Sequence, residues 1–191
     1  YDSNDSEQLL DEALASINTY LKSPGDYRAD EEIWYYFVAE NLLSTADLDI
    51  YSKYPLILKG TNTKKISKLI NLAHQYAQQG YDLAKNKKLL QETLVNSLIL
   101  KAQHQNTNST EQTQALQDIK KHKDLFSLNN SNYSDVAQIY AIRGDIPKMR
   151  EWALNYSGHY CRWISDKEQF QQFPPDVKTW LISNAQCRSY F

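Results

Sequence analysis

The stretch at residues 132–156 constrains the fold most, because it reads as two short amphipathic helices that meet at a tight turn. Apolar residues recur at helical spacing on both sides of Gly144-Asp145. Pro147 stands in the first turn of the second helix, where its missing N–H costs little. Neither helix can bury its apolar side alone. The pattern therefore predicts helices stacked on neighbouring helices, an architecture that usually binds other molecules.

The same apolar periodicity recurs along most of the chain. It predicts helices at 6–22, 30–43, 64–79, 82–105, 109–126, 133–143, 146–157 and 173–188. Gly80 is expected to end the third of these, and Ser109 with Gln112 has the form of a capping box. Residues 44–62 are expected to form an irregular connection that packs across the first two helices. With only 5 glycines and 5 prolines, the chain has few turn signals for a β fold.

We therefore expect an all-α fold of stacked antiparallel helical hairpins. A chain of 191 residues is predicted to form one domain, 1–191. Within it, 1–62 would form an N-terminal hairpin with its irregular connection, and 63–191 a helical array.

Residues 133–157 resemble a tetratricopeptide-type repeat. Tyr140 stands four residues before Gly144, Gly144-Asp145 matches the small-residue turn, and Met149, Ala153 and Tyr156 fall where the second helix packs on the first. Residues 65–80 resemble another first helix of this kind, with Leu69, Leu72, Ala73 and Tyr76 before Gly80. The second helix after Gly80 is too long for the family, and Met149 replaces its expected Ala. The resemblance covers about a third of the chain and implies a right-handed α–α superhelix whose concave surface holds a peptide or partner domain, with no chemistry.

Charge is unevenly distributed although the net charge is only −2. Residues 1–50 carry 12 acids and 2 bases, whereas residues 51–101 carry 9 bases and 2 acids. Complementarity between neighbouring helices accounts for this split most simply, and a basic face for an anionic partner is the alternative. The lysines of residues 59–88 favour an acidic protein or peptide partner. Nucleic acid is not expected, because the chain is acidic overall and its lysines are scattered.

Cys161 and Cys187 are predicted to form a disulfide that ties the last helix to the preceding one. Two unrelated buried thiols in a cytoplasmic protein are the alternative. The disulfide, with the polar start at Tyr1, favours an exported protein or lipoprotein body at the periplasm or cell surface, its membrane contact limited to a removed N-terminal anchor. An engineered truncation would leave the same start.

The chain contains 14 tyrosines, too many to place all of them in a core. Tyr35, Tyr51, Tyr54, Tyr156 and Tyr160 in particular cannot all be buried. Aromatic core packing is one interpretation, and an aromatic groove for a partner is the other. The predicted partner-binding anchors are Trp34, Tyr36, Tyr140, Trp152 and Tyr156.

The sequence predicts a protein that is not an enzyme and that uses no cofactor or metal. His74, His104, His122 and His159 lack ligand spacing, and there is no glycine-rich phosphate loop. The predicted function is non-enzymatic protein or peptide binding.

Two alternatives remain open. The first is a small glycan-acting enzyme that uses Glu31, Glu32 or Glu40 beside aromatic residues. The second is an inhibitor or immunity-type protein that blocks one partner enzyme.

Overall fold

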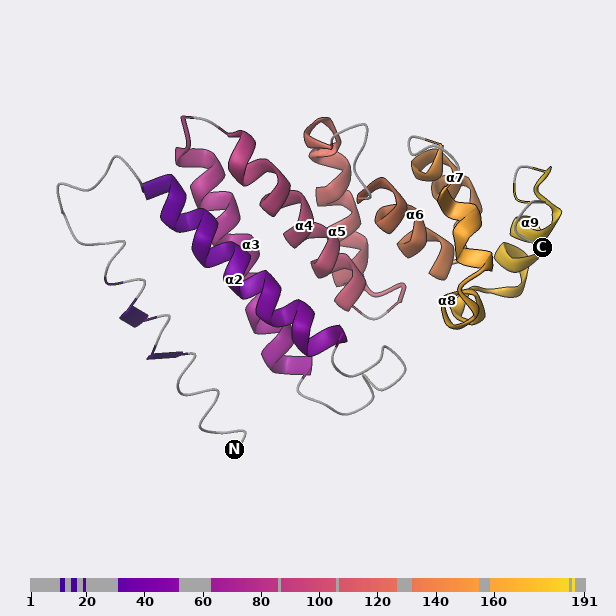
Figure 1. Ribbon diagram of the computed structural model, residues 1–191, viewed down its shortest axis with the longest axis horizontal. Helices are drawn as coiled ribbons and strands as arrows, with labels where there is room; N and C mark the ends of the chain where they lie inside the picture. The colour runs from indigo at the N-terminus through magenta and orange to yellow at the C-terminus, as the bar shows by residue number, and fades with distance from the viewer. Residues whose placement is uncertain are drawn as a thin grey trace. The chain divides into compact units, whose positions relative to one another are not determined.

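The structure is a computed structural model of the chain. It describes residues 11–12, 15–16, 19, 31–51, 63–85, 87–105, 107–126, 132–154, 159–185 and 187. Every regular element within these ranges is an α-helix or a short 3-10 helix, and none of the described residues forms a strand (Figure 1). The all-α prediction is therefore confirmed. The predicted helix at 6–22 falls mostly outside the described residues, as does most of the predicted connection at 44–62.

The chain divides into two compact units, Tyr1–Leu94 and Val95–Phe191, with the boundary inside α4 (Lys88–His104). Unit 1 contains α2 (Glu31–Tyr51), α3 (Thr63–Leu83) and the start of α4. Unit 2 contains the rest of α4 and the elements that follow it. The expectation of a single domain stays a prediction.

In unit 1, α2 and α3 lie side by side and antiparallel (Figure 1). Their contact buries apolar residues at three- and four-residue spacing, as the periodicity predicts. On α3 the buried set is Ile66, Leu69, Ile70, Ala73, Tyr76 and Ala77, and on α2 it is Tyr35, Ala39, Leu42 and Leu43. The rings of Tyr35 and Tyr76 lie 6.2 Å apart, centroid to centroid. Leu90 and Leu94 at the start of α4 are also buried.

Three predicted boundaries in unit 1 are wrong. Gly80 lies inside α3, which continues to Leu83, so Gly80 does not end this helix. The next helix begins at Lys88 and not at residue 82, because residues 82 and 83 still belong to α3. Helix α2 continues to Tyr51, eight residues beyond its predicted end, since no Gly or Pro interrupts the chain before Pro55.

Unit 2 is built from short helices around one hydrophobic core. Its elements after α4 are α5 (Thr110–Lys121), η3 (Lys123–Leu125), α6 (Asn132–Ile142), α7 (Ile146–Ala153), η4 (His159–Ile164), α8 (Lys167–Gln172) and α9 (Pro175–Ser183). Buried residues of α4 to α9 form one continuous cluster that includes Ile119, Val136, Met149, Trp152, Trp163, Val177 and Leu181.

The predicted turn at Gly144 is confirmed. Gly144 has φ of +75°, the left-handed conformation that glycine adopts without steric cost. The N–H of Asp145 donates to the carbonyl of Tyr140 at 3.0 Å, and the N–H of Gly144 donates to the carbonyl of Ala141 at 3.0 Å. This is the Schellman pattern of helix termination. Asp145 then caps α7 by accepting from the N–H of Lys148 at 3.2 Å.

The predicted cap of α5 is also present, with one difference. Ser109 Oγ accepts from the N–H of Gln112 at 3.1 Å, as expected. The side chain of Gln112 is buried and accepts at Oε1 from the N–H of Asn108 instead of that of Ser109. Arg143, just after α6, donates to the same oxygen at 2.6 Å and to Thr113 Oγ1 at 3.3 Å. These bonds join the start of α5 to the end of α6.

The C-terminal region differs most from the sequence prediction. The last helix was predicted at 173–188, but α9 ends at Ser183. The structure has η4 and α8 between residues 157 and 173, where the apolar periodicity predicts no helix. The predicted disulfide between Cys161 and Cys187 is present, with a Cα–Cα distance of 5.0 Å. Both cysteines are buried in the core of unit 2.

Candidate functional site

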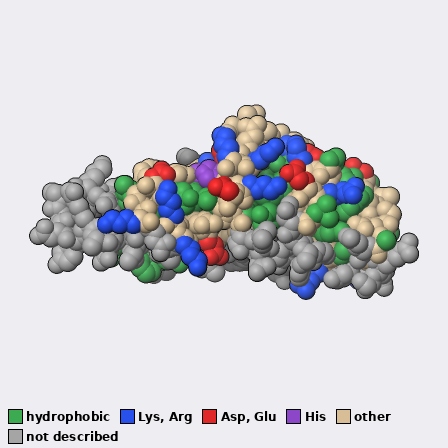
Figure 2. Space-filling view, turned by 90° about the horizontal axis from the view of Figure 1, so that it is seen from above, with side chains coloured by type: hydrophobic (Ala, Val, Ile, Leu, Met, Phe, Trp, Pro, Cys, Tyr) green, Lys and Arg blue, Asp and Glu red, His purple; other side chains and the backbone are tan. Residues whose placement is uncertain are grey.

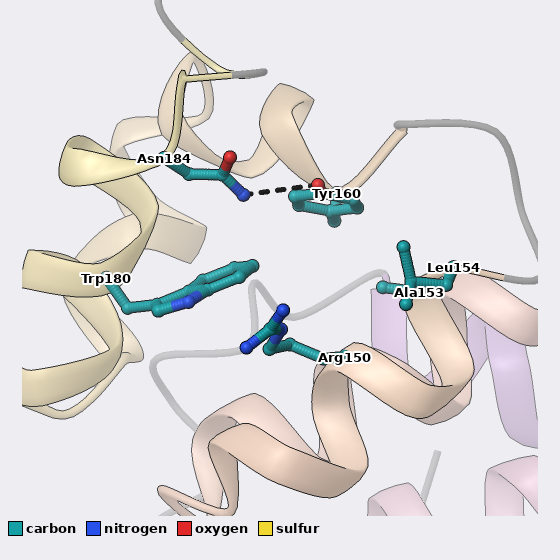
Figure 3. A pocket seen from close by; sticks show the side chains of 6 residues that line it. All are labelled: Arg150, Ala153, Leu154, Tyr160, Trp180 and Asn184. Atoms are coloured by element: carbon teal, nitrogen blue, oxygen red, sulfur yellow. Dashed lines mark hydrogen bonds between the residues drawn. The ribbon is translucent and has the colours of Figure 1, made fainter.

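A pocket of about 210 Å³ opens on unit 2 between α7, η4 and α9 (Figure 3). Its lining residues are Arg150, Ala153, Leu154, Tyr160, Trp180 and Asn184. They carry one cation, two aromatic rings, one amide and two aliphatic groups. Such a mixture of apolar walls with a few polar groups is typical of a recognition site. The volume is below the roughly 300 Å³ at which sites for drug-sized ligands begin, so it suits a single side chain.

The amphipathic pattern of α7 positions the first wall of the pocket. Met149 and Trp152 are buried in the core, which turns the intervening Arg150 toward solvent. Leu154 follows directly after α7 and is 67% exposed. An exposed leucine at the rim of a pocket provides apolar contact area that is already accessible to a partner.

The opposite wall comes from α9. Val177 and Leu181, four residues apart, are fully buried and hold this helix against the core. Trp180 stands at the edge of this buried stripe and is half-buried. Figure 3 shows the Arg150 side chain extending from α7 toward the Trp180 indole. The guanidinium carbon of Arg150 lies over that ring, 5.7 Å from its centroid.

This stacking fixes a cation at the pocket without neutralising it. No described residue accepts a hydrogen bond from the Arg150 guanidinium or forms an ion pair with it. A guanidinium stacked on an aromatic ring uses its face, whereas its N–H donors point outward from its edge. The arrangement therefore offers positioned donors to an incoming acceptor.

Tyr160 and Asn184 close the third side. The Tyr160 ring is 4% exposed and lies 5.8 Å from the Trp180 ring, centroid to centroid. Asn184 donates through Nδ2 to the Tyr160 hydroxyl at 3.2 Å (Figure 3). Cys161 follows Tyr160 directly, and the N–H of Cys187 donates to the carbonyl of Asn184 at 2.9 Å. The disulfide thus joins the two segments that supply these groups.

Other cations of unit 2 also lie over aromatic rings. Figure 2 shows Lys and Arg side chains beside hydrophobic ones on this part of the surface. Lys123 lies over Trp152 at 4.9 Å, Lys148 over Tyr140 at 5.5 Å, and Lys178 over Phe170 at 5.9 Å. Lys123 and Lys148 also pair with carboxylates, Glu151 at 3.2 Å and Asp145 at 3.0 Å. These pairings distinguish them from Arg150.

The predicted partner-binding residues fall in different places. Trp34 is 45% exposed on α2 of unit 1. Tyr36 on the same helix is half-buried, and its ring lies 5.5 Å from that of Phe37, which is 52% exposed. Helix α2 thus carries two exposed aromatic residues, Trp34 and Phe37, three positions apart.

Tyr140 and Trp152 instead belong to the core of unit 2. Trp152 is 2% exposed and packs against Phe126 and Tyr133, with ring centroids 5.4 and 5.7 Å away. Tyr140 is 7% exposed, and burial raises the pKa of its hydroxyl. Their buried side chains offer little surface to a partner. The fifth predicted residue, Tyr156, lies outside the described residues.

Of the three glutamates considered as catalytic acids, the structure describes the side chain of Glu40 only. Glu40 Oε1 accepts from the Thr93 hydroxyl at 2.5 Å, and Thr93 is fully buried. This bond joins α2 to α4 and gives Glu40 a structural role. Within the described part of the chain, no group of three or more His, Cys, Asp or Glu side chains could hold a metal ion.

The sequence does not predict that Arg150, Tyr160, Trp180 and Asn184 line one pocket. The first and last of them are 34 positions apart in sequence, so no local motif connects them. The predicted disulfide carried the signal, because it brings the segments around Cys161 and Cys187 together and two pocket residues belong to those segments.

Comparison with protein-family models, curated proteins and solved structures finds no match for this chain. Among the described helices, none has the length and apolar character needed to cross a bilayer.

Proposed function

We propose that this protein is a non-enzymatic module that binds a protein or peptide partner, and that unit 2 carries the binding site. The observation that carries the proposal is the pocket between α7, η4 and α9. Its open cavity is lined by two aromatic rings, a stacked guanidinium and an exposed leucine. Aromatic residues and arginine are the groups most enriched among the residues that dominate protein interfaces.

The size of the pocket supports a peptide ligand. About 210 Å³ accommodates one side chain, while the exposed Leu154 beside it offers contact to the neighbouring residue of an extended chain. Binding of this kind anchors one residue in a pocket and leaves the rest of the peptide on the surface. The inhibitor or immunity-type alternative would use the same contacts and differ only in its partner.

We further propose that α6 and α7 form a tetratricopeptide-like hairpin and that such hairpins form a right-handed superhelix. The turn at Gly144, the burial of Tyr140 on α6 and the burial of Met149 and Ala153 on α7 support the first part of this proposal. Export to the periplasm or cell surface, as a secreted protein or lipoprotein body, is proposed from the disulfide. A bond between two buried cysteines persists best in an oxidising compartment.

Peptide selection tests the binding proposal. A random peptide library would be selected on the immobilised full chain, and the affinities of the enriched peptides measured by calorimetry. Binding that is lost in Trp180→Ala and retained in Trp34→Ala would support the proposed site. Binding that depends on Trp34 instead would move the site to unit 1, and failure to enrich any peptide would count against the function.

A panel of oligosaccharides incubated with the same protein tests the enzymatic alternative. Release of shortened glycans that is abolished by Glu31→Gln, Glu32→Gln or Glu40→Gln would replace the binding proposal with that alternative.

A further inference from the structure

We infer that the pocket between α7, η4 and α9 recognises a carboxylate of the partner, with Arg150 as its receptor group. This inference rests on the proposed peptide-binding function and specifies the chemistry of the residue that enters the pocket. Three observations carry it: the stacked Arg150 guanidinium, the absence of acidic groups among the described lining residues and the single cation among them.

The guanidinium is positioned before any ligand arrives. Its place over the Trp180 ring, 5.7 Å from the centroid, restricts a side chain that is otherwise long and mobile. Less conformational entropy is therefore lost when a ligand binds. The planar donor edge of arginine matches the two oxygens of a carboxylate, which allows two parallel N–H···O bonds.

The surroundings select for negative charge. None of the six described lining residues is acidic, and Arg150 is the one cation among them, so these residues favour a carboxylate. A cationic ligand would be repelled by Arg150. The aromatic walls strengthen the interaction, because a hydrogen-bonded ion pair is worth more where water is partly excluded.

A single guanidinium also distinguishes a carboxylate from a phosphate. Phosphate recognition in peptides generally uses clusters of arginines that balance a dianion. Among the lining residues that the structure describes, Arg150 is the only cation. One positive charge balances the single charge of an aspartate, a glutamate or a chain terminus. Residues 59–88 are rich in lysine, which independently favours an acidic partner.

Defined peptides test the inference. The probe is acetyl-Gly-Leu-Glu-Leu-Gly-amide, and the matched control is the same peptide with Gln in place of Glu. Binding to the full chain would be followed through the Trp180 indole N–H signal in nitrogen-15 NMR spectra, assigned with Trp180→Phe. We expect the Glu peptide to bind at least about tenfold more tightly than the Gln peptide, as one charge-assisted pair contributes.

Two substitutions of Arg150 separate charge from shape. Arg150→Gln should remove the preference for Glu, and Arg150→Lys should retain only a minor part of it because the planar fork is lost. Lys178→Gln is the control, since it removes another cation that lies over a ring of unit 2 but does not line the pocket. It should leave the preference unchanged. Circular dichroism of each variant checks that the fold is retained.

The outcomes distinguish the inference from the function on which it rests. Equal affinity for both peptides, or a Glu preference that survives in Arg150→Gln, would overturn carboxylate recognition while retaining peptide binding. No change of the Trp180 signal with either peptide would count against both. A peptide that ends in a free carboxylate, acetyl-Gly-Leu-Leu, shows whether a side chain or a chain terminus is preferred. Tighter binding of a phosphoserine peptide would overturn the carboxylate assignment.

Discussion

Gly80 of α3 lies so close to Tyr35 of α2 that a Cβ atom added to Gly80 would stand 2.5 Å from the Tyr35 Cβ. The same added atom would lie 3.0 Å from a terminal methyl group of Leu90. The close approach of α2 and α3 therefore requires glycine at position 80, although glycine has a low intrinsic propensity for the interior of a helix. Because the Tyr35 Cβ is attached directly to the backbone, only a movement of α2 away from α3 could accommodate a side chain.

The first prediction is that Gly80→Ala destabilises the protein. Replacing glycine by alanine in a helix usually stabilises by up to about 1 kcal/mol, but overpacking of this kind costs about 1 to 3 kcal/mol or more. We expect a net loss of about 1 to 2 kcal/mol in the free energy of unfolding, measured by urea titration. Gln79→Ala, at an exposed position of the same helix, should change it by less than about 0.5 kcal/mol. A Gly80→Ala protein as stable as the wild type would contradict the close approach of α2 and α3.

The disulfide predicts a strong dependence of stability on redox conditions. Cys161 and Cys187 are 26 residues apart in sequence, and closing a loop of that size stabilises by about 3 kcal/mol in the chain-entropy model. Reduction should therefore lower the thermal midpoint of the wild type. Scanning calorimetry with and without a phosphine reductant measures this, and the Cys161→Ser/Cys187→Ser double variant should not respond to the reductant. Two titratable thiols in the untreated protein would contradict the bond.

The contact of Arg143 with Gln112 should contribute more to the stability of unit 2 than an exposed ion pair does. Arg143→Ala removes the charge-assisted bond to Gln112 and the longer bond to Thr113. The expected loss in unfolding free energy is about 1.5 to 3 kcal/mol. Lys121→Ala, which breaks an exposed ion pair with Asp118 on α5, should cost less than about 1 kcal/mol. Equal effects of the two substitutions would show that Arg143 does not join α5 to α6.

Asp135, in the first turn of α6, should make stability depend on pH in an unusual direction for an acid. Burial raises its pKa from 3.8 to about 6. Asp135 then binds its proton more tightly in the folded state than in the unfolded state. This proton stabilises the fold fully below about pH 3.8, and its contribution is lost as the pH rises through about 6.

Asp135→Asn should consequently raise the unfolding free energy at pH 7 by about 1 to 3 kcal/mol. The substitution should also abolish the decline in unfolding free energy between about pH 4 and 6. Glu111→Gln, at an exposed position in the first turn of α5, is the control and should retain the wild-type pH profile. Urea titrations at several pH values check both variants, and an Asp135→Asn profile parallel to that of the wild type would contradict the shift.

The parts of the fold that local sequence determines could be predicted. Apolar spacing predicts the buried side of α3 because a helix repeats every 3.6 residues. The turn at Gly144 could be predicted because glycine and the following aspartate complete a termination signal within a few residues. The disulfide could be predicted because the chain has only two cysteines.

Features decided by tertiary contact could not be predicted in this way. Gly80 was interpreted as a helix end, since the sequence does not show that another helix passes close to it. Trp152 was interpreted as a binding residue, since sequence alone does not distinguish a buried tryptophan from an exposed one. Arg150 and Trp180 are thirty residues apart in sequence, and only the folded chain brings them together.

The position of the Cys161–Cys187 bond has a consequence for ligand binding. Tyr160 directly precedes Cys161, and the backbone carbonyl of Asn184 accepts a hydrogen bond from the N–H of Cys187. The disulfide therefore restricts the distance between the two walls of the cavity that these residues form. A ligand that requires those walls in their present places would bind the oxidised protein in preference to the reduced one. By thermodynamic reciprocity, an occupied cavity would then make the disulfide harder to reduce by the same factor. The rate at which a reductant exposes the two thiols would thus indicate whether the cavity is occupied. An oxidising environment would in turn raise the affinity of the cavity for its ligand.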